Sequence, residues 1–160
     1  MAAYPTEFAP AERAPAHEVW RQAQLFSDNL LLRSVLDAVP QIVLVVNEQR
    51  QMVFANQALY ALSGLDPNNP PVGRRPGEIL ECAHADDRTG GCGTTEFCRT
   101  CGAVRVLLSA LRGIEMVDEC RIIQVEGSAL DLRVKSAPLE IDGQQFAVFA
   151  IEDISHEKRR

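Results

Sequence analysis

Four of the five cysteines in this 160-residue chain fall close together in one glycine-rich stretch. They are Cys82, Cys92, Cys98 and Cys101, spaced C-x9-C-x5-C-x2-C, and the last three lie in the segment GGCGTTEFCRTCG. Four thiolates suffice to hold one Zn²⁺ ion or one iron–sulfur cluster. The neighbouring glycines let the backbone curl around such a site and point N–H groups inward. The spacing therefore predicts a metal-binding loop over residues 82–102.

The pair formed by Cys98 and Cys101 leads directly into a predicted helix over residues 103–113. The free N–H groups at a helix N-terminus lower thiolate pKa values and donate hydrogen bonds to sulfur. Structural zinc sites often use two separated C-x-x-C pairs, and this chain has one. The single pair favours an iron–sulfur cluster, with zinc as the alternative.

Two other side chains are reserve ligands. His84 follows Cys82 by two positions and would complete a Cys₃His site, although its polar surroundings are more typical of a surface histidine. Cys120 lies on a predicted strand beside Ile122, which is more typical of a core residue.

The sequence around the cysteines also bears on haem attachment, thioredoxin-like redox chemistry and metal-free thiol sensing. A c-type haem requires C-x-x-C-H, but Gly102 follows Cys101. A thioredoxin-like pair requires a βαβ setting, which the surrounding pattern does not predict. A metal-free thiol sensor that forms disulfides among Cys92, Cys98 and Cys101 stays open.

Charge and hydrophobic composition indicate where in the cell we expect the protein and which classes of partner we do not expect. The formal net charge of −6 weighs against nucleic acid as a partner. The longest apolar run, residues 42–46, is far too short to span a membrane. The first 20 residues lack the basic and apolar regions of a secretory signal. We therefore expect a cytoplasmic protein with reduced or metal-bound cysteines and no membrane partner.

Secondary-structure elements can be placed around the cysteine loop. Residues 1–16 are rich in Ala, Pro and Glu without periodicity, which predicts a flexible arm. Apolar residues then recur at helical spacing, which predicts an amphipathic helix over 17–39 that Asp28 and Asn29 could interrupt. Pro40 ends it.

The remainder alternates between strands and short helices, and the last third is rich in strands. The predicted strands cover residues 41–47, 51–56, 118–127, 129–141 and 144–154, and a short helix covers 57–65 before a loop over 66–77. In the strand 129–141, Leu130, Leu132 and Val134 alternate with charged residues, so one face is buried. The order predicts an α+β fold.

Two stretches carry a resemblance to a known family. The segments VLDAVPQIVLVVNEQRQMVFANQALYALSG and FAVFAIEDISHEKRR resemble the PAS domain over roughly residues 30–155. The resemblance implies a PAS domain over 40–154, with a five-stranded antiparallel sheet, short helices on one face and a cavity between them. It implies a sensory or dimerising module, and residues 155–160 would begin a connecting helix to an output domain. The cysteine loop would then sit where PAS domains line their cavity.

A second resemblance concerns the loop alone. CGTTEFCRTC is similar to the cluster-binding loop of adrenodoxin-type ferredoxins, which hold a [2Fe–2S] centre on C-x5-C-x2-C. The resemblance implies the same cluster here and leaves the fourth ligand open, with Cys82 as the nearest candidate. The PAS cofactors flavin and haem lack their signatures, since ECAHAD does not match the flavin motif and 103–113 contains no histidine.

No catalytic motif appears, so we do not expect an enzyme. The leading expectation is a cytoplasmic redox or oxygen sensor that holds an iron–sulfur cluster, with charges such as Arg88, Arg99 and Arg105 tuning its potential. A zinc-stapled interaction module is the alternative. We expect a homodimer through the N-terminal helix and an output partner such as the histidine kinase of a two-component system.

Overall fold

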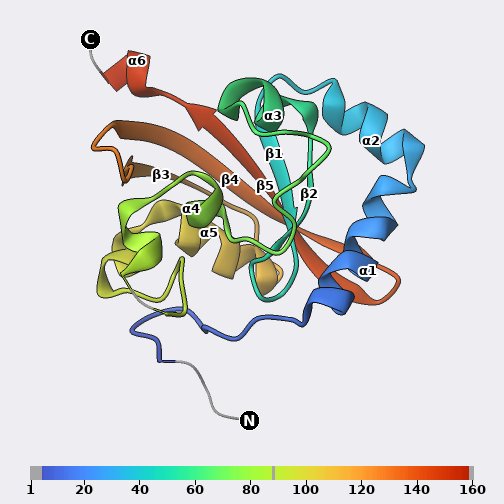
Figure 1. Cartoon of the computed structure of the whole chain (residues 1–160), viewed down its shortest axis with the longest axis horizontal. Helices are drawn as coiled ribbons and strands as arrows, with labels where there is room; N and C mark the ends of the chain where they lie inside the picture. The colour runs from blue at the N-terminus through green and yellow to red at the C-terminus, as the bar shows by residue number, and fades with distance from the viewer. Residues whose placement is uncertain (1–4, 88, 159–160) are drawn as a thin grey trace.

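Five antiparallel strands form the centre of the fold. The structure is a computed structural model that describes residues 5–87 and 89–158. The strands are β1 (Ile42–Val46), β2 (Met52–Ala55), β3 (Met116–Ile123), β4 (Ala129–Ile141) and β5 (Gln144–Asp153). They lie in the order β2-β1-β5-β4-β3, and all neighbours are antiparallel (Figure 1). The predicted α+β fold is confirmed.

Short helices connect the strands. The α-helices are α1 (Ala16–Ser27), α2 (Leu30–Asp37), α3 (Gln57–Ser63), α4 (Pro76–Ile79), α5 (Gly102–Leu111) and α6 (Ser155–Lys158). The cysteine loop adds two 3₁₀ helices, η1 (Ala83–Asp86) and η2 (Glu96–Thr100). None of the helices in the described ranges has both the length and the apolar composition needed to cross a membrane.

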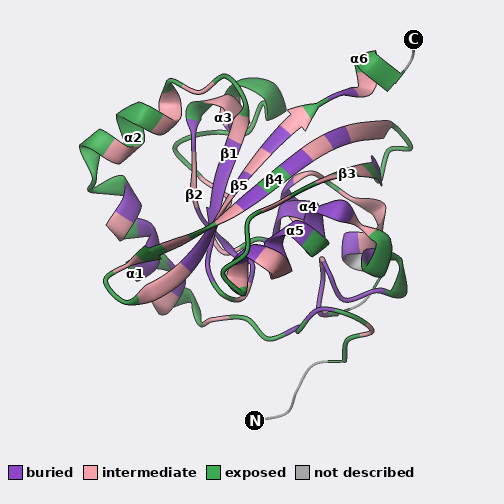
Figure 2. Cartoon of the chain, turned by 180° about the vertical axis from the view of Figure 1, so that it is seen from behind, coloured by how far each residue is buried: buried purple, intermediate pink, exposed green. Residues whose placement is uncertain are grey.

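Apolar side chains are buried on both faces of the sheet. On one face Leu44 and Phe149 pack with Val106 of α5 in the larger core. On the other face Phe146 contacts Phe26 of α1 edge-on, with ring centroids 5.2 Å apart. Figure 2 shows the buried residues along the strands and on the inner sides of α1 and α5. Alternation along each strand supplies both cores.

The N-terminal helix differs from the single helix predicted over 17–39. It consists of α1 and α2, because Asn29 interrupts it and its side chain accepts a hydrogen bond from the Leu32 N–H at 3.0 Å. This side-chain cap starts the second helix. No residue of α2 is fully buried: Leu32 packs partly against the smaller core, whereas Leu30, Leu31 and Val35 are exposed.

The N-terminal arm also differs from the prediction. Residues 5–15 form no regular structure but run along the cysteine loop (Figure 1). The Ala9 N–H donates to the Gly93 carbonyl at 3.0 Å, and Ala9 and Ala11 are buried. The arm is therefore packed over residues 5–15, whereas residues 1–4 of the predicted flexible segment lie outside the described residues.

Two turns have backbone conformations that matter for the sequence prediction. Asp142 and Gly143 join β4 and β5 with φ angles of 51° and 76°, as expected for a predicted Asp-Gly turn. In the turn between β1 and β2, Arg50 has φ 64°, in the left-handed region that a non-glycine side chain rarely adopts. The Asn47 side chain holds this turn by accepting the Gln49 and Gln51 N–H groups.

Candidate cysteine site

All five cysteines line one cavity of about 230 Å³ between the sheet and the helices of the cysteine loop. The cavity is bordered by α4, η1, η2, α5 and the end of β3. The four predicted ligands, Cys82, Cys92, Cys98 and Cys101, are thus brought to the same space, and both reserve candidates, His84 and Cys120, join them. The remaining lining is mostly apolar and includes Leu80, Phe97, Val104, Leu107 and Ile122.

Backbone N–H groups lie close to the sulfur atoms of Cys92 and Cys82 and favour their thiolate forms. They belong to Gly77 near Cys92, and to His84 and Ala85 near Cys82. Burial nevertheless raises the pKa of Cys92 to about 12 and also raises the pKa of Cys82. Both thiols are therefore protonated in the metal-free chain, and metal binding would release their protons.

Cys92 and Cys82 approach each other across Gly77. A Cβ atom added to Gly77 would lie 2.7 Å from Cys92 Sγ and 3.5 Å from Cys82 Cβ. Glycine is required at this position because any larger side chain would displace the Cys92 thiol. This close approach brings the cysteine that begins the loop next to one near its middle.

Cys98 and Cys101 are positioned by the start of α5. Cys101 is the N-cap residue of α5, and the nearby Val104 and Ala103 N–H groups favour its thiolate form. Cys98 is buried, and its Sγ lies 3.2 Å from the Thr95 hydroxyl. The helix N-terminus thus stabilises negative charge on Cys101.

Cys101 also forms a hydrogen bond with Cys120 of β3. This bond lowers the pKa of Cys101 and raises the pKa of Cys120, because the thiol of Cys120 donates to the thiolate. Cys120 packs against the main core as well, so it is both a core residue and part of the cavity wall.

The four thiols line the same cavity but do not form a preformed metal-binding geometry. Across residues 5–87 and 89–158, no three His, Cys, Asp or Glu side chains lie in an arrangement that could already hold a metal ion. The donor chemistry fits an iron–sulfur cluster or zinc, since the cavity offers thiols with hydrogen-bond donors at their sulfurs. Binding would therefore require the cysteine side chains to turn inward.

The low pKa of Cys101 leads to a testable expectation for the metal-free chain. Because thiolates are the reactive form, we expect iodoacetamide to modify Cys101 about tenfold or more faster than Cys92 at roughly pH 7. The rate at Cys101 should fall as the pH drops through its lowered pKa. Cys120→Ala removes the hydrogen bond that lowers this pKa, so the pH profile of Cys101 should move to higher pH. Peptide mass spectrometry over a pH series measures both effects, and equal rates at the two cysteines would contradict the assignment.

His84 is already engaged by neighbours. Its ring stacks on Phe97 with centroids 4.3 Å apart, and its Nδ1 lies 2.8 Å from Asp87 Oδ2. It lies at the wall of the cavity in a partly exposed position. These contacts favour the expected surface histidine over a ligand.

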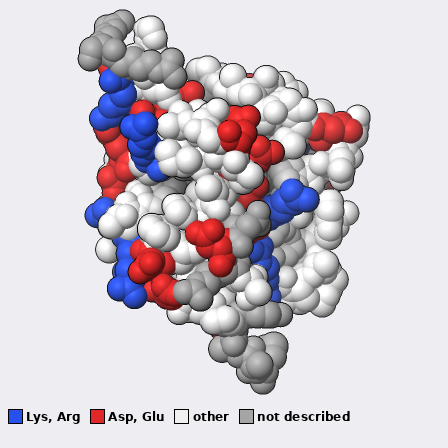
Figure 3. All heavy atoms as spheres, turned by 60° about the vertical axis from the view of Figure 1, so that its left-hand side comes forward, with Lys and Arg blue, Asp and Glu red and all other residues white. Residues whose placement is uncertain are grey.

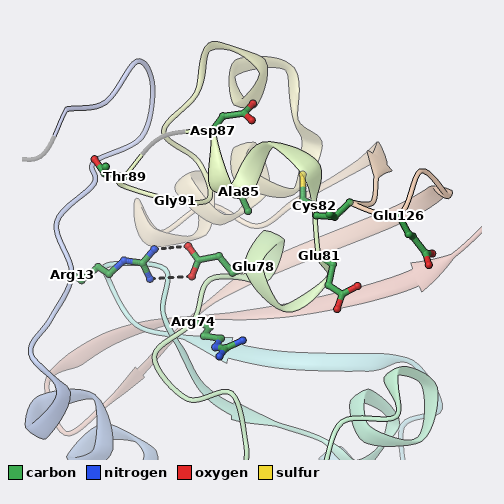
Figure 4. A pocket seen from close by; sticks show the side chains of 11 residues that line it. Arg13, Arg74, Glu78, Glu81, Cys82, Ala85, Asp87, Thr89, Gly91 and Glu126 are labelled. Carbon is green, nitrogen blue, oxygen red and sulfur yellow. Dashed lines mark hydrogen bonds and ion pairs between the residues drawn. The ribbon is translucent and has the colours of Figure 1, made fainter.

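Glu78 of α4 ties the cysteine loop to the N-terminal arm. Its carboxylate forms a bidentate ion pair with Arg13 of the arm (Figure 4) and also accepts the Cys92 N–H at 3.1 Å. Burial alone would raise the pKa of Glu78, but hydrogen bonds from Arg13 and from the Arg75 and Cys92 N–H groups lower it. A larger hollow of about 950 Å³ opens around this ion pair, next to the cysteine cavity.

Arg75 joins three segments from inside the protein. It is fully buried and donates to the carbonyls of Gln49, Gly90 and Glu12, each at 2.9 Å. These carbonyls belong to the β1–β2 turn, the cysteine loop and the arm. Burial, and then the nearby charges of Arg50 and Arg13, lower the pKa of Arg75 to about 9.

The arginines predicted to tune the site lie elsewhere. Arg99 donates to the Glu7 carbonyl, Arg105 lies 3.3 Å from Asp118, and Arg88 lies outside the described residues. Arg121 and the buried Arg50 line the cavity, and sequence reasoning missed Arg50. In the sequence Arg50 is the last residue of the turn NEQR, and nothing in the charge pattern around it predicts that it is buried.

The surface charges are mixed where the cysteine side of the molecule comes forward. Acidic and basic side chains are interspersed on the face drawn in Figure 3. Ion pairs connect several of them, including Lys158 with Glu119 at 2.7 Å and Arg133 with Glu152 at 3.4 Å. These pairs hold the end of β5 and α6 against β3 and β4.

Comparison with known proteins identifies the fold. Residues 30–102 match the PAS domain family. The PAS domain of nitrogen regulation protein NR(II) from Vibrio parahaemolyticus superposes with a TM-score of 0.54 at 16% identity, covering 78% of this chain and 98% of that chain. The PAS domain of BvgS from Bordetella pertussis gives 0.53 at 15% identity, covering 83% and 90%. A PAS domain from Colwellia psychrerythraea gives 0.53 at 16% identity, covering 77% and 93%.

No curated protein matches this chain significantly. The matched residues and the sheet order β2-β1-β5-β4-β3 nevertheless agree with the resemblance found in the sequence. The chain therefore has the PAS fold, and its residues 30–102 match the PAS domain family.

Proposed function

We propose that this PAS domain senses redox state or oxygen through an iron–sulfur cluster held by Cys82, Cys92, Cys98 and Cys101. The observation that carries the proposal is that these four cysteines line one cavity, in which nearby backbone N–H groups favour the thiolate forms of Cys82, Cys92 and Cys101. Such donors stabilise thiolate ligands and set the potential of a centre. The loop spacing favours a [2Fe–2S] type, and when bound the cluster supplies reversible electron transfer.

Ligand binding would order the cysteine loop. The thiols of Cys82 and Cys92 carry protons in the metal-free chain and would release them on binding. Their side chains would turn into the cavity, which requires small shifts of the backbone around Gly77. A change in occupancy or charge would therefore act on α4 and on the loop that precedes η2.

Two contacts carry such a change out of the site. Cys101 caps α5, which packs on β3 and β4 of the sheet. The Cys92 N–H binds Glu78, which holds Arg13 in the arm that leads into α1. The proposed signal thus reaches α1 through the arm and reaches the sheet through α5.

Hydrogen–deuterium exchange on the cluster-loaded chain tests this function. We expect oxidation and reduction to change exchange reversibly in residues 5–15 and at the start of α5. The β1–β2 hairpin should serve as an internal reference. A cluster that changes oxidation state without altering exchange in either segment would rule out the proposed signalling route.

A second candidate is a metal-free thiol sensor, favoured by the hydrogen bond between Cys101 and Cys120. Under oxidant it would form disulfides, with mass changes that thiol reductants reverse. A third candidate is an interaction module that zinc only staples. Zinc would stabilise the loop, and the protein would be colourless and insensitive to reduction.

We also propose a homodimer formed through the N-terminal helices. In α2, Leu30 is 73% exposed, Leu31 76% and Val35 56%, and Figure 2 shows no buried residue on this helix. An unpartnered apolar helix face gains free energy when a second copy covers it.

Substitution on this face tests the dimer. Leu31→Glu should weaken self-association about tenfold or more, because it places a charge in the centre of an apolar contact. Arg33→Glu places the same carboxylate on the side of this helix away from Leu31 and Val35, where residue 33 is exposed, so this control should leave self-association nearly unchanged. Sedimentation velocity over a concentration series measures both variants. Equal behaviour of the two would exclude this helix as the interface.

The setting of the domain follows from the same proposal. We propose a cytoplasmic, non-catalytic sensor whose output partner is a signalling protein such as a histidine kinase. The described tail supports a connection at this end, since α6 continues directly from β5 and Ile154 anchors it in the core. Neither nucleic acid nor a membrane is part of the proposed mechanism.

A further inference from the structure

Arg50 is a buried cation without an anionic partner. Its side chain is 2% exposed, and among the described residues it forms no ion pair with a carboxylate. One guanidinium nitrogen, Nη2, donates to the Cys92 carbonyl at 3.1 Å, while Nε has no hydrogen-bond partner. An unpaired buried charge is costly, so a native protein normally compensates it.

The guanidinium lies at the wall of the cysteine cavity. It packs on Gly93, where a Cβ atom would come within 2.8 Å of Nη2, so glycine is needed for this close approach. The backbone at Arg50 is in the left-handed region, which costs free energy for a non-glycine residue. The turn thus accepts strain in a conformation that holds a cation beside the thiols.

The charged groups around Arg50 leave its positive charge uncompensated. The guanidinium lines the same cavity as the Cys92 and Cys98 thiols, and Glu78 is already ion-paired with Arg13. Burial lowers the pKa of Arg50, and the positive charge of Arg13 acts in the same direction. Four thiolates around a divalent metal or a cluster give a complex with net negative charge. Such a complex would provide the counter-charge that the described protein groups do not supply.

We infer that Arg50 is the internal counter-cation of the cysteine site and that its charge stabilises an anionic metal–thiolate complex in the cavity. The inference rests on the proposed ligand set, but not on which metal occupies it. Arg50 is a positioning and charge-compensating residue rather than a ligand. Its removal should weaken every tetrathiolate complex formed there.

Anaerobic titration with Co²⁺ alone tests this inference, because cobalt thiolates have a characteristic visible absorption. Arg50→Gln removes the charge and should weaken Co²⁺ binding about tenfold or more. Arg50→Lys keeps the charge and should bind within about threefold of the wild type. Arg105→Gln is the control, since this arginine pairs with Asp118 and does not line the cavity. Circular dichroism of the metal-free variants verifies that each is folded.

The outcomes separate this inference from the proposed function. Wild-type affinity in Arg50→Gln would overturn the role of Arg50 while leaving the ligand set intact. If Arg50→Gln does not fold, a tenfold loss in Arg50→Lys overturns the charge argument by itself. Charge-dependent Co²⁺ binding by a chain that takes up no iron–sulfur cluster would support the inference and refute the redox function. A wild-type chain that forms no cobalt–thiolate complex would overturn both.

Discussion

Cys98→Ser should abolish the iron–sulfur centre of the reconstituted chain. Cys98 is a buried member of the four-cysteine set, so no solvent molecule or neighbouring thiol can readily replace its sulfur. Mutation of a residue that only supports a metal ligand typically lowers metal affinity about tenfold to hundredfold. Loss of a direct ligand should cost at least as much, so bound iron should fall about tenfold or more. Iron and acid-labile sulfide per chain, measured after anaerobic reconstitution, give the result.

Cys120→Ser is the matched control for this experiment. Cys120 lines the same cavity but lies on β3 and packs with the core, and the proposed ligand set does not include it. We therefore expect its variant to keep most of the bound iron. Equal loss in both variants would move Cys120 into the ligand set, and full retention in Cys98→Ser would exclude Cys98 from it.

Arg75→Met should produce the largest loss of stability among single substitutions outside the apolar core. The substitution removes every donor that holds the Gln49, Gly90 and Glu12 carbonyls together inside the protein. Leaving such groups unsatisfied should lower the free energy of unfolding by about 3 kcal/mol or more. For a chain of this size the melting temperature should fall by about 6–12 °C.

Arg74→Met controls for the loss of a charge at the adjacent position. Arg74 is exposed, so we expect its variant to differ from the wild type by about 0.5 kcal/mol or less. Denaturant unfolding measures both, and hydrogen exchange should also show faster exchange in residues 5–15 of Arg75→Met alone. Equal stability of the two variants would contradict the role given to Arg75.

The strands and the position of the site were predictable from local patterns. Leu130, Leu132 and Val134 alternate with charged residues along β4, and this alternation predicts which face is buried. In the structure Leu132 and Val134 are buried, and Leu130 packs partly buried against the same core. The cysteine spacing located the cavity because four of its lining residues come from one continuous segment. Residue patterns within single segments therefore sufficed to predict the strands and to place the cysteine site.

The rest depends on contacts between distant segments. Arg50 and Arg75 look like ordinary surface charges in the sequence, and their burial follows only from the carbonyls that converge on them. The arm over residues 5–15 has no periodicity because it forms no regular element, and its alanines are buried by the cysteine loop. The break of the N-terminal helix is, by contrast, a local feature that the sequence indicated at Asp28 and Asn29, and the Asn29 side chain caps the second helix there.

We propose above all that four cysteines hold an iron–sulfur cluster in the cavity of this PAS fold. An anaerobic ultraviolet–visible spectrum with iron, zinc and sulfide analysis on the same sample tests it most directly. We predict broad absorption between roughly 320 and 460 nm that dithionite bleaches, together with iron and acid-labile sulfide in equal amounts. A colourless chain with about one zinc ion, or with no metal at all, would contradict it.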